Sequence, residues 1–404
     1  MTEFSTSASA PSLTGVRVVE FASDPAGEFT GQMLSDLGAE VIKVEPENGS
    51  PTRSVGPFAA GRRDHNSSLT FWYYNTNKRS VVCDIGSEQG RADLERLLET
   101  ADIFLSTLQP SELKALNLDF AELRARFPRL IILSVTPFGL SGPWADRLSS
   151  DLVALALGGP LNMCGYDDHT ISPIRPGGNQ AYHTAASYAQ IGALLALLER
   201  EQSGRGQLVD VSMHEALAVT VELANPYWFY PRSNVYRQTC RHAQPTPTQP
   251  ALFLCADGRY VYFALILSDQ KPWKNLVQWM DSKGMAADLT DPAYSEFKYR
   301  QANFSHIQEL VECFFLVNDA DLVFHEGQGY GLPIGILNAP EDLKADEHLK
   351  VRDFFVPVQY EGVGEVSYPG PVLRYSAIPP VRRSRAPNLG EHTNSILNAI
   401  SGTK

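Results

Sequence analysis

Two neighbouring side chains, Tyr182 and His183, carry groups that could move a proton. An imidazole titrates near neutral pH, whereas a phenol has an unperturbed pKa of about 10, so His183 is the better candidate for an acid or base. Lyases, hydratases and isomerases use such groups, because a positioned side chain exchanges a proton with the reacting molecule. The competing interpretation is that His183 simply packs or faces solvent. Asp167 and Asp168 lie in a predicted loop, and we interpret them as solvated charges.

A second candidate is the turn at residues 23–27, which could bind an anion. It joins a predicted strand to a predicted helix, and the first N–H groups of a helix attract negative charge. Any α/β protein has such a turn, so the pattern also fits an ordinary connection. The sequence contains no Walker A, G-x-G-x-x-G, G-x-S-x-G or H-E-x-x-H motif, and its nine histidines show no spacing of metal ligands. We therefore predict no metal site.

Alternating strands and helices must position these residues. Apolar runs predict strands at residues 16–22, 40–45, 80–85, 102–106, 130–135 and 208–212, and helical patterns occur at 29–37, 89–100, 111–127, 180–201 and 213–223. Such alternation predicts a doubly wound α/β domain with a parallel sheet. The periodicity fades at residues 226–250, where prolines and aromatic side chains are frequent, and a β-hairpin is predicted at 251–264. A second domain is therefore expected to begin near residue 226.

The overall composition excludes several classes of protein. A net charge of −12 and a pI of about 5.3 argue against a nucleic-acid-binding protein, which needs a basic surface. The five cysteines form no C-x-x-C pair, which fits a reducing cytosol without disulfides or zinc. The apolar stretch at residues 185–198 is interrupted by polar side chains and is too short to span a bilayer. We expect a cytoplasmic protein with no membrane or nucleic-acid partner.

Five parts of the sequence resemble the signatures of family III CoA transferases, the formyl-CoA transferase and carnitine CoA-transferase type. They are residues 37–45 after Ala26-Gly27, residues 75–80 followed by Asp84, residues 134–143, residues 203–215, and residues 332–343 with 346–355. The most specific match is at residues 203–215. Because all five occur in the family's order, the chain is identified as a member of this family.

The resemblance implies a fold and an assembly. A large α/β domain would be built from residues 1–225 and 331–404, with a smaller domain at residues 226–330 inserted between them. Two such chains would form interlocked rings. The reaction would use a coenzyme A thioester as substrate, with no covalently bound cofactor.

Matching motif positions also imply contacts with coenzyme A. The candidates are Ala26, Gly27, Asn77, Lys78 and Arg79. For Lys78 and Arg79, a surface salt bridge is the alternative interpretation.

The family's nucleophile is an aspartate, and its position holds Tyr182 here. We located this position by counting back without gaps from Gly204-Arg-Gly206, guided by the helix register at residues 192–198. The family's carboxylate attacks an acyl-CoA thioester to give a mixed anhydride, which a phenol cannot form. A shift by one residue gives Ala181 or His183, and neither is a carboxylate.

Other positions also depart from the family pattern. The histidine of the racemase branch would stand just before Asp151, where Ser150 is found. Gln109 replaces an arginine that could meet phosphate, and it lacks that charge. Glu28 replaces a proline, and it would repel CoA phosphates if it pointed at them. The stretch at residues 238–249 corresponds to a glycine-rich lid but has no glycine.

The combined losses favour a non-catalytic subunit of a heteromeric CoA transferase, whose partner is a homologous chain that keeps the aspartate. The narrower resemblance is to the aspartate-lacking subunit of a family member that acts in aromatic acid degradation. The aromatic run at residues 227–230 could line a pocket for such an acid, although core packing explains the run more simply. One alternative is a self-sufficient acyl-CoA lyase, hydratase or isomerase that uses His183 or Tyr182 as acid or base. Another is a binding or scaffold protein without coenzyme A.

Overall fold

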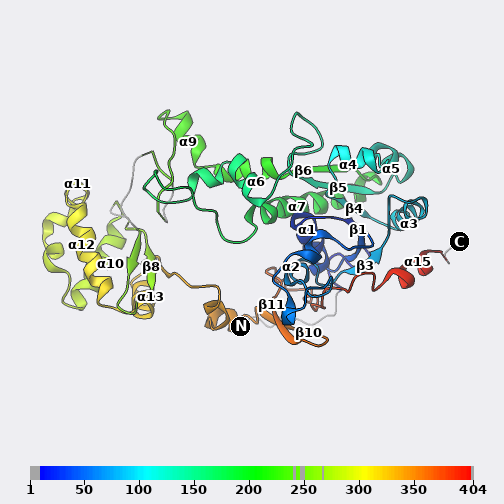
Figure 1. The fold of residues 1–404 in the computed structure, drawn as a ribbon. Coiled ribbons are helices and arrows are strands. Elements are labelled where there is room, and N and C mark those ends of the chain that lie inside the picture. Colours follow the sequence, from blue (N-terminus) through cyan, green and yellow to red (C-terminus); the bar gives the residue numbers. More distant parts are fainter. Residues whose placement is uncertain (1–9, 240–242, 246–250, 266–267, 402–404) are drawn as a thin grey trace. The chain divides into compact units, whose positions relative to one another are not determined.

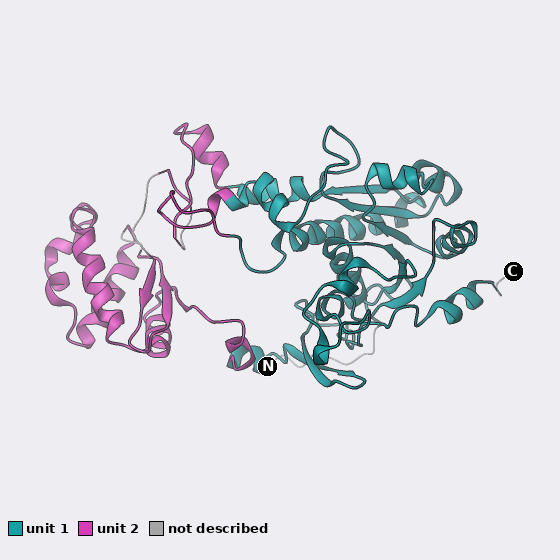
Figure 2. Cartoon of the chain, in the orientation of Figure 1, with its two compact units in different colours: residues 1–161, 175–222, 347–404 teal, residues 162–174, 223–346 magenta. Residues whose placement is uncertain are grey.

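The structure is a computed structural model that describes residues 10–239, 243–245, 251–265 and 268–401. The chain divides into two compact units (Figure 2). Unit 1 contains residues 1–161, 175–222 and 347–404, and unit 2 contains residues 162–174 and 223–346. The division into domains at residues 1–225, 226–330 and 331–404 stays a prediction, because compactness does not show which parts fold independently.

Unit 1 is built on a parallel sheet of six strands. The strands are β1 (Arg17–Phe21), β2 (Glu40–Glu45), β3 (Arg79–Val82), β4 (Ile103–Ser106), β5 (Ile131–Thr136) and β6 (Leu208–Ser212). Their order is β3-β2-β1-β4-β5-β6, and every neighbouring pair is parallel. Figure 1 shows this order running from β6 to β3. All six predicted strands are present, which confirms the α/β fold with a parallel sheet.

Helices cover both faces of this sheet. They are α1 (Pro25–Asp36), α2 (Leu69–Tyr74), α3 (Glu88–Leu98), α4 (Pro110–Ala115), α5 (Phe120–Arg126), α6 (Asp151–Leu157), α7 (Gln180–Ser203), α8 (Met213–Ala218) and α15 (Thr393–Ser401). Val18 packs into the core shared with α1, α6, α7 and α8, whereas Val19 packs into the core shared with α3, α4, α5 and α15. The two cores lie on opposite faces because successive side chains of a strand alternate.

Helix α7 lies close against α1 because small side chains line their contact. Ala185, Ala189 and Ala193 are fully buried in the same core as Leu34 of α1. Gly192 is equally constrained, since a Cβ atom there would lie 2.8 Å from a methyl group of Val209. The run of small residues therefore lets α7 pack closely against α1 and β6.

Two predicted helices are wrong in extent. Residues 111–127 form α4 and α5 instead of one helix, because Asn117 adopts a positive φ of 50° that a right-handed helix cannot continue. Residues 213–223 form α8 and a short 3₁₀ turn at Val219–Val221. Neither break changes the sheet.

Unit 2 is a small antiparallel sheet with helices. The strands β7 (Leu252–Leu254), β8 (Tyr260–Phe263) and β9 (Ile334–Ile336) pair in the order β7-β8-β9, and the β7–β8 pairing confirms the predicted hairpin. The helices are α9 (Ala224–Phe229), α10 (Gln270–Ser282), α11 (Phe297–Ala302), α12 (Phe304–Leu316) and α13 (Ala320–Gly329). Trp279, Phe314 and Phe315 form the centre of its separate core.

The C-terminal part of the chain returns to unit 1. It contains α14 (Glu347–Val351) and the antiparallel hairpin of β10 (Phe355–Tyr360) and β11 (Gly364–Pro369). Further on, Thr393 accepts a hydrogen bond from the backbone of Val82 on the edge strand β3. A single chain does not test the interlocked-ring dimer, which stays a prediction. In the part of the chain that the structure describes, no helix has the length and apolar character to cross a membrane.

Candidate functional site

The start of α7 is held by the buried carboxylate of Asp151. One oxygen of Asp151 accepts a hydrogen bond of 2.8 Å from the backbone N–H of Ala181, and the other accepts one of 2.9 Å from Nε of Arg175. A second guanidinium nitrogen of Arg175 lies 2.7 Å from the same oxygen. A negative charge at the first turn of a helix is stabilising, so Asp151 fixes the place at which α7 begins. Tyr182 and His183 follow directly on that turn.

His183 is held by a tyrosine and an asparagine from two other positions. Nε2 of His183 lies 3.0 Å from the hydroxyl of Tyr74 at the end of α2, and Asn179 donates to the same hydroxyl at 2.9 Å. The ring of Phe29 lies against the imidazole, with 4.5 Å between the ring centroids. Burial lowers the pKa of His183, and the charge of Asp151 opposes this only in part, so the imidazole is neutral at neutral pH.

Tyr182 is half-buried against the core shared by α1 and α7. Burial raises the pKa of its phenol to about 12, and the negative charges of Asp24 and Asp151 add to this shift. The backbone of Asp151 forms a hydrogen bond with the hydroxyl group, which lowers the pKa and opposes only part of this rise. Tyr182 is therefore a neutral phenol at neutral pH.

The β1–α1 turn already holds a negative charge of its own. The carboxylate of Asp24 accepts hydrogen bonds from the backbone N–H groups of Ala26 at 2.9 Å and Gly27 at 3.1 Å. Burial raises the pKa of Asp24 to about 6. Ala26 and Gly27 are buried, and a Cβ atom on Gly27 would lie 2.4 Å from Thr107. A contact of these two residues with coenzyme A stays a prediction, and it would compete with Asp24.

Glu28 points into the interior of unit 1, where it belongs to a cluster of buried charges. Lys43 lies 2.9 Å from Glu28 and 3.0 Å from Glu20, and Lys78 lies 2.7 Å from Glu20. The four side chains are fully enclosed. Thr52 also donates to Glu28 at 2.7 Å. The carboxylate is thus neutralised inside the protein, and it does not face a ligand as a free charge.

The three CoA-binding candidates after α2 lie in different surroundings. The ammonium group of Lys78 donates to the carbonyl oxygen of Glu28 and to the side chain of Asn75. The surface interpretation is therefore wrong for Lys78, because its side chain is enclosed, whereas Arg79 forms a partly exposed pair with Glu40. Asn77 adopts a positive φ of 64° and accepts a hydrogen bond from the backbone of Ser384. Their roles in binding stay predictions.

The structure also describes Gln109 and part of the predicted lid. The side-chain amide of Gln109, which precedes α4, donates to the carbonyl oxygens of Ala145 and Arg147, so it ties the start of α4 to the loop before α6. Of the predicted lid at residues 238–249, residues 240–242 and 246–249 lie outside the described part of the chain. In the described ranges, no group of three histidine, cysteine or acidic side chains could hold a metal ion.

Sequence reasoning missed Tyr74, Arg175 and Asn179. Tyr74 directly precedes residues 75–80, and this position beside a family motif was the sequence feature that could have marked it as a site residue. No spacing in the sequence relates it to His183, which lies 109 residues away.

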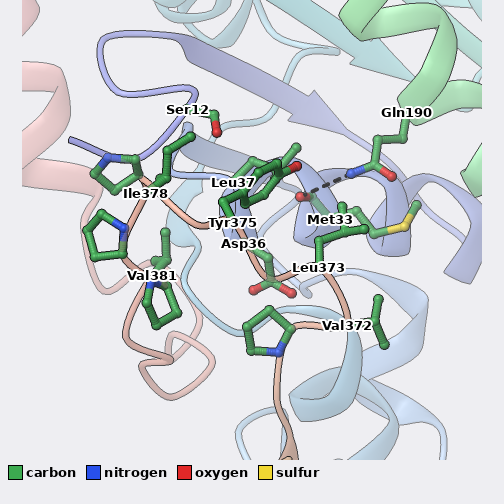
Figure 3. Close-up of a pocket in the computed structure, with 14 residues that line it drawn as sticks. Ser12, Met33, Asp36, Leu37, Gln190, Val372, Leu373, Tyr375, Ile378 and Val381 are labelled. Atoms are coloured by element: carbon green, nitrogen blue, oxygen red, sulfur yellow. Dashed lines mark hydrogen bonds between the residues drawn. The ribbon is translucent and has the colours of Figure 1, made fainter. Parts of the chain in front are cut away.

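A separate cleft of unit 1 lies between α1, α7 and residues 371–381 (Figure 3). Its volume is about 560 Å³ including solvent at its mouth, and its lining is mostly apolar. Gln190 closes one end through a hydrogen bond of 3.5 Å to the carbonyl oxygen of Met33. None of the predicted site residues lines this cleft.

A family model for CoA-transferase family III matches residues 13–393. The chain belongs to CoA-transferase family III. It is 32% identical, over 94% of its length and 92% of the relative, to subunit BbsE of succinyl-CoA:(R)-benzylsuccinate CoA-transferase from Thauera aromatica. It is 31% identical, over 96% and 94%, to the beta subunit of succinyl-CoA–L-malate CoA-transferase from Chloroflexus aurantiacus. The predicted family is confirmed.

Two solved structures have the same fold. A CAIB/BAIF family protein from Brucella suis superposes with a TM-score of 0.83 at 27% identity, covering 97% of this chain and 100% of that one. Rv3272 from Mycobacterium tuberculosis gives a TM-score of 0.77 at 26% identity, covering 95% and 98%. The chain therefore has this fold, and its named relatives are CoA transferases, enzymes that act on coenzyme A thioesters.

Proposed function

We propose that this chain is the non-catalytic subunit of a heteromeric CoA transferase, which moves coenzyme A between carboxylic acids. The proposal is supported by the buried phenol of Tyr182, whose pKa is raised to about 12. We match its position to the family's nucleophilic aspartate. The partner is a homologous family III chain that keeps this aspartate.

The chemistry explains why a phenol cannot replace the carboxylate. The carboxylate oxygen attacks the thioester carbonyl, CoA thiolate leaves, and a mixed anhydride forms. The thiolate then attacks the enzyme's own acyl carbon, releases the donor acid, and leaves an enzyme thioester. A phenol has no acyl carbon, so it could form only an ester of the donor acid. With a pKa of about 12, only about one Tyr182 in 10⁵ is ionised at pH 7.

The outward face of α7 supports an association with another protein. Ile191, Leu195 and Leu198 leave 54%, 60% and 61% of their surface exposed. Their spacing places them along one face of the helix, and an apolar stripe in water is typical of a protein interface. Relatives of this chain are named as subunits of CoA transferases. We assign this face to the homologous partner.

The narrower proposal concerns the acid that is processed. A relative of this chain is named for benzylsuccinate, an acid with an aromatic ring. Trp228, Phe229 and Tyr230 at the end of α9 are exposed, so the core-packing interpretation of this run is wrong for them. An exposed aromatic cluster can contact an aromatic acid, and degradation of aromatic acids is the pathway class that we propose.

The test is to express the chain alone and together with a family III homologue that keeps the aspartate. Both samples are incubated with succinyl-CoA and then with hydroxylamine, and each subunit is weighed by mass spectrometry. Activity and a hydroxamate on the partner's aspartate are expected only in the complex. An acyl or CoA adduct on this chain would overturn the proposal.

A second candidate function is a self-sufficient acyl-CoA lyase, hydratase or isomerase. The contact between Tyr74 and His183 favours it, because a histidine held in place by a hydrogen bond can transfer protons. This function predicts turnover by the chain alone that is lost in His183→Ala. The first proposal predicts no turnover by the isolated chain.

A further inference from the structure

A chain of hydrogen bonds with a fixed direction ends on His183. Arginine only donates, and a guanidinium nitrogen of Arg175 lies 3.4 Å from the side-chain oxygen of Asn179. The amide NH₂ group of Asn179 is thereby left to face Tyr74, and it donates to the Tyr74 hydroxyl at 2.9 Å. The orientation of Asn179 is therefore set by the charge of Arg175.

The direction continues through Tyr74 to the imidazole. A phenol has a single proton, and the Tyr74 oxygen already accepts a hydrogen bond from Asn179. Among the described residues, Nε2 of His183, 3.0 Å away, is the only acceptor within reach of the Tyr74 proton, so we take Nε2 as the acceptor. A neutral imidazole whose Nε2 accepts a hydrogen bond carries its proton on Nδ1.

Two further observations agree with this arrangement. Burial raises the pKa of Tyr74 to about 12, so the phenol keeps the proton that it donates. Burial also lowers the pKa of His183, which favours the neutral ring. In the described part of the chain, no residue accepts a hydrogen bond from Nδ1 of His183, and the side chain is only half-buried.

We propose that Tyr74 and Asn179 are positioning residues that hold His183 as the neutral Nδ1–H tautomer, and that Nδ1–H donates a hydrogen bond to an acyl oxygen bound beside Tyr182. The ligand would be a carboxylate or the carbonyl group of a thioester. His183 in this role binds and orients an oxygen, and it does not transfer a proton. The ligand class rests on the proposed function, whereas the tautomer does not.

The tautomer is measured directly on the full chain labelled with ¹⁵N-histidine. Long-range ¹H–¹⁵N correlations distinguish a protonated ring nitrogen from an unprotonated one, and His183→Gln identifies the His183 signals among those of nine histidines. The expected pattern at pH 7.5 is a protonated Nδ1 and an unprotonated Nε2. A protonated Nε2, or a charged ring, would overturn the proposal.

Asn179→Asp is expected to reverse the direction of these hydrogen bonds. A carboxylate at position 179 accepts the proton of Tyr74, so the Tyr74 oxygen must accept from Nε2, and the His183 proton is expected to move to Nε2. Tyr74→Phe removes the hydroxyl group without reversal, and a mixture of the two tautomers is expected. The positioning role is wrong if both variants keep the wild-type tautomer. If Asn179→Asp does not fold, the result for Tyr74→Phe decides by itself.

The ligand is probed with succinate. The Nδ1 proton of His183 is expected to shift on addition of succinate to wild type, and to shift less in Asn179→Asp. Suppose that the Nδ1 proton does not shift, although the partner subunit of the complex still forms the acyl adduct. This outcome would refute the binding role of His183 and leave the proposed function intact. An adduct on this chain with an unchanged Nδ1–H tautomer would refute the proposed function and leave the tautomer intact.

Discussion

Lys78 and Glu20 form an enclosed ion pair, in which the ammonium nitrogen lies 2.7 Å from a carboxylate oxygen and neither side chain is exposed to solvent. Arg79, the next residue, pairs with Glu40 while 40% of its side chain is exposed. Two adjacent basic residues of one motif therefore differ in their exposure to solvent. The first belongs to the interior, and the second belongs to the surface.

This contrast predicts opposite effects on stability. Lys78→Met leaves Glu20 with Lys43 as its remaining buried cation, and breaking a buried pair costs about 3–5 kcal/mol of unfolding free energy. Arg79→Met is the matched control and is expected to cost less than about 1 kcal/mol, because exposed pairs contribute little. Urea unfolding followed by circular dichroism measures both. A Lys78→Met chain with wild-type stability and weaker CoA binding would instead assign Lys78 to the ligand.

The hydroxyl group of Tyr182 should be dispensable for CoA transfer. In the complex with the partner subunit, Tyr182→Phe is expected to keep kcat within about two-fold, because a neutral phenol makes no covalent contribution. The control is replacement of the partner's aspartate by asparagine, which should abolish turnover. A loss of ten-fold or more in Tyr182→Phe would favour the acid–base alternative.

His183 gives the fold a defined dependence on pH. Its pKa is lowered in the folded protein, so below the ordinary value of about 6.5 the unfolded chain binds a proton that the folded chain does not. The stability contributed by His183 is therefore fully present above about pH 6.5. It decreases as the pH falls from there toward the lowered pKa of the folded protein. Urea midpoints between pH 7.5 and 5.5 should fall less in His183→Gln than in wild type. Equal falls in the two proteins would argue against a lowered pKa.

The exposed face of α7 should determine association with the partner. Leu195→Glu is expected to reduce co-purification of the homologous subunit at least ten-fold, because it places a charge in an apolar contact. The unfolding midpoint of the isolated chain should stay unchanged, since 60% of Leu195 is exposed. Glu201→Gln, an exposed position on the same helix, is the control that should co-purify normally. Normal co-purification of Leu195→Glu would place the interface elsewhere.

The sequence predicted the sheet well because its central strands are buried on both faces. Runs such as Ile131–Thr136 are mostly apolar, and that composition can be recognised without knowledge of neighbouring strands. The break at Asn117 was missed, because a single left-handed residue leaves the apolar spacing of residues 111–127 almost unchanged. Helix ends were therefore less predictable than the strands.

The sequence by itself determined which groups are available at the site: a phenol at position 182 beside an imidazole at position 183. Only the tertiary structure decided how these groups are held. It enclosed Lys78 beside Glu20, turned Glu28 toward Lys43, and brought Tyr74 to His183. The identity of a side chain is local information, whereas its charge state and hydrogen bonds depend on burial and on partners that packing brings from distant parts of the chain.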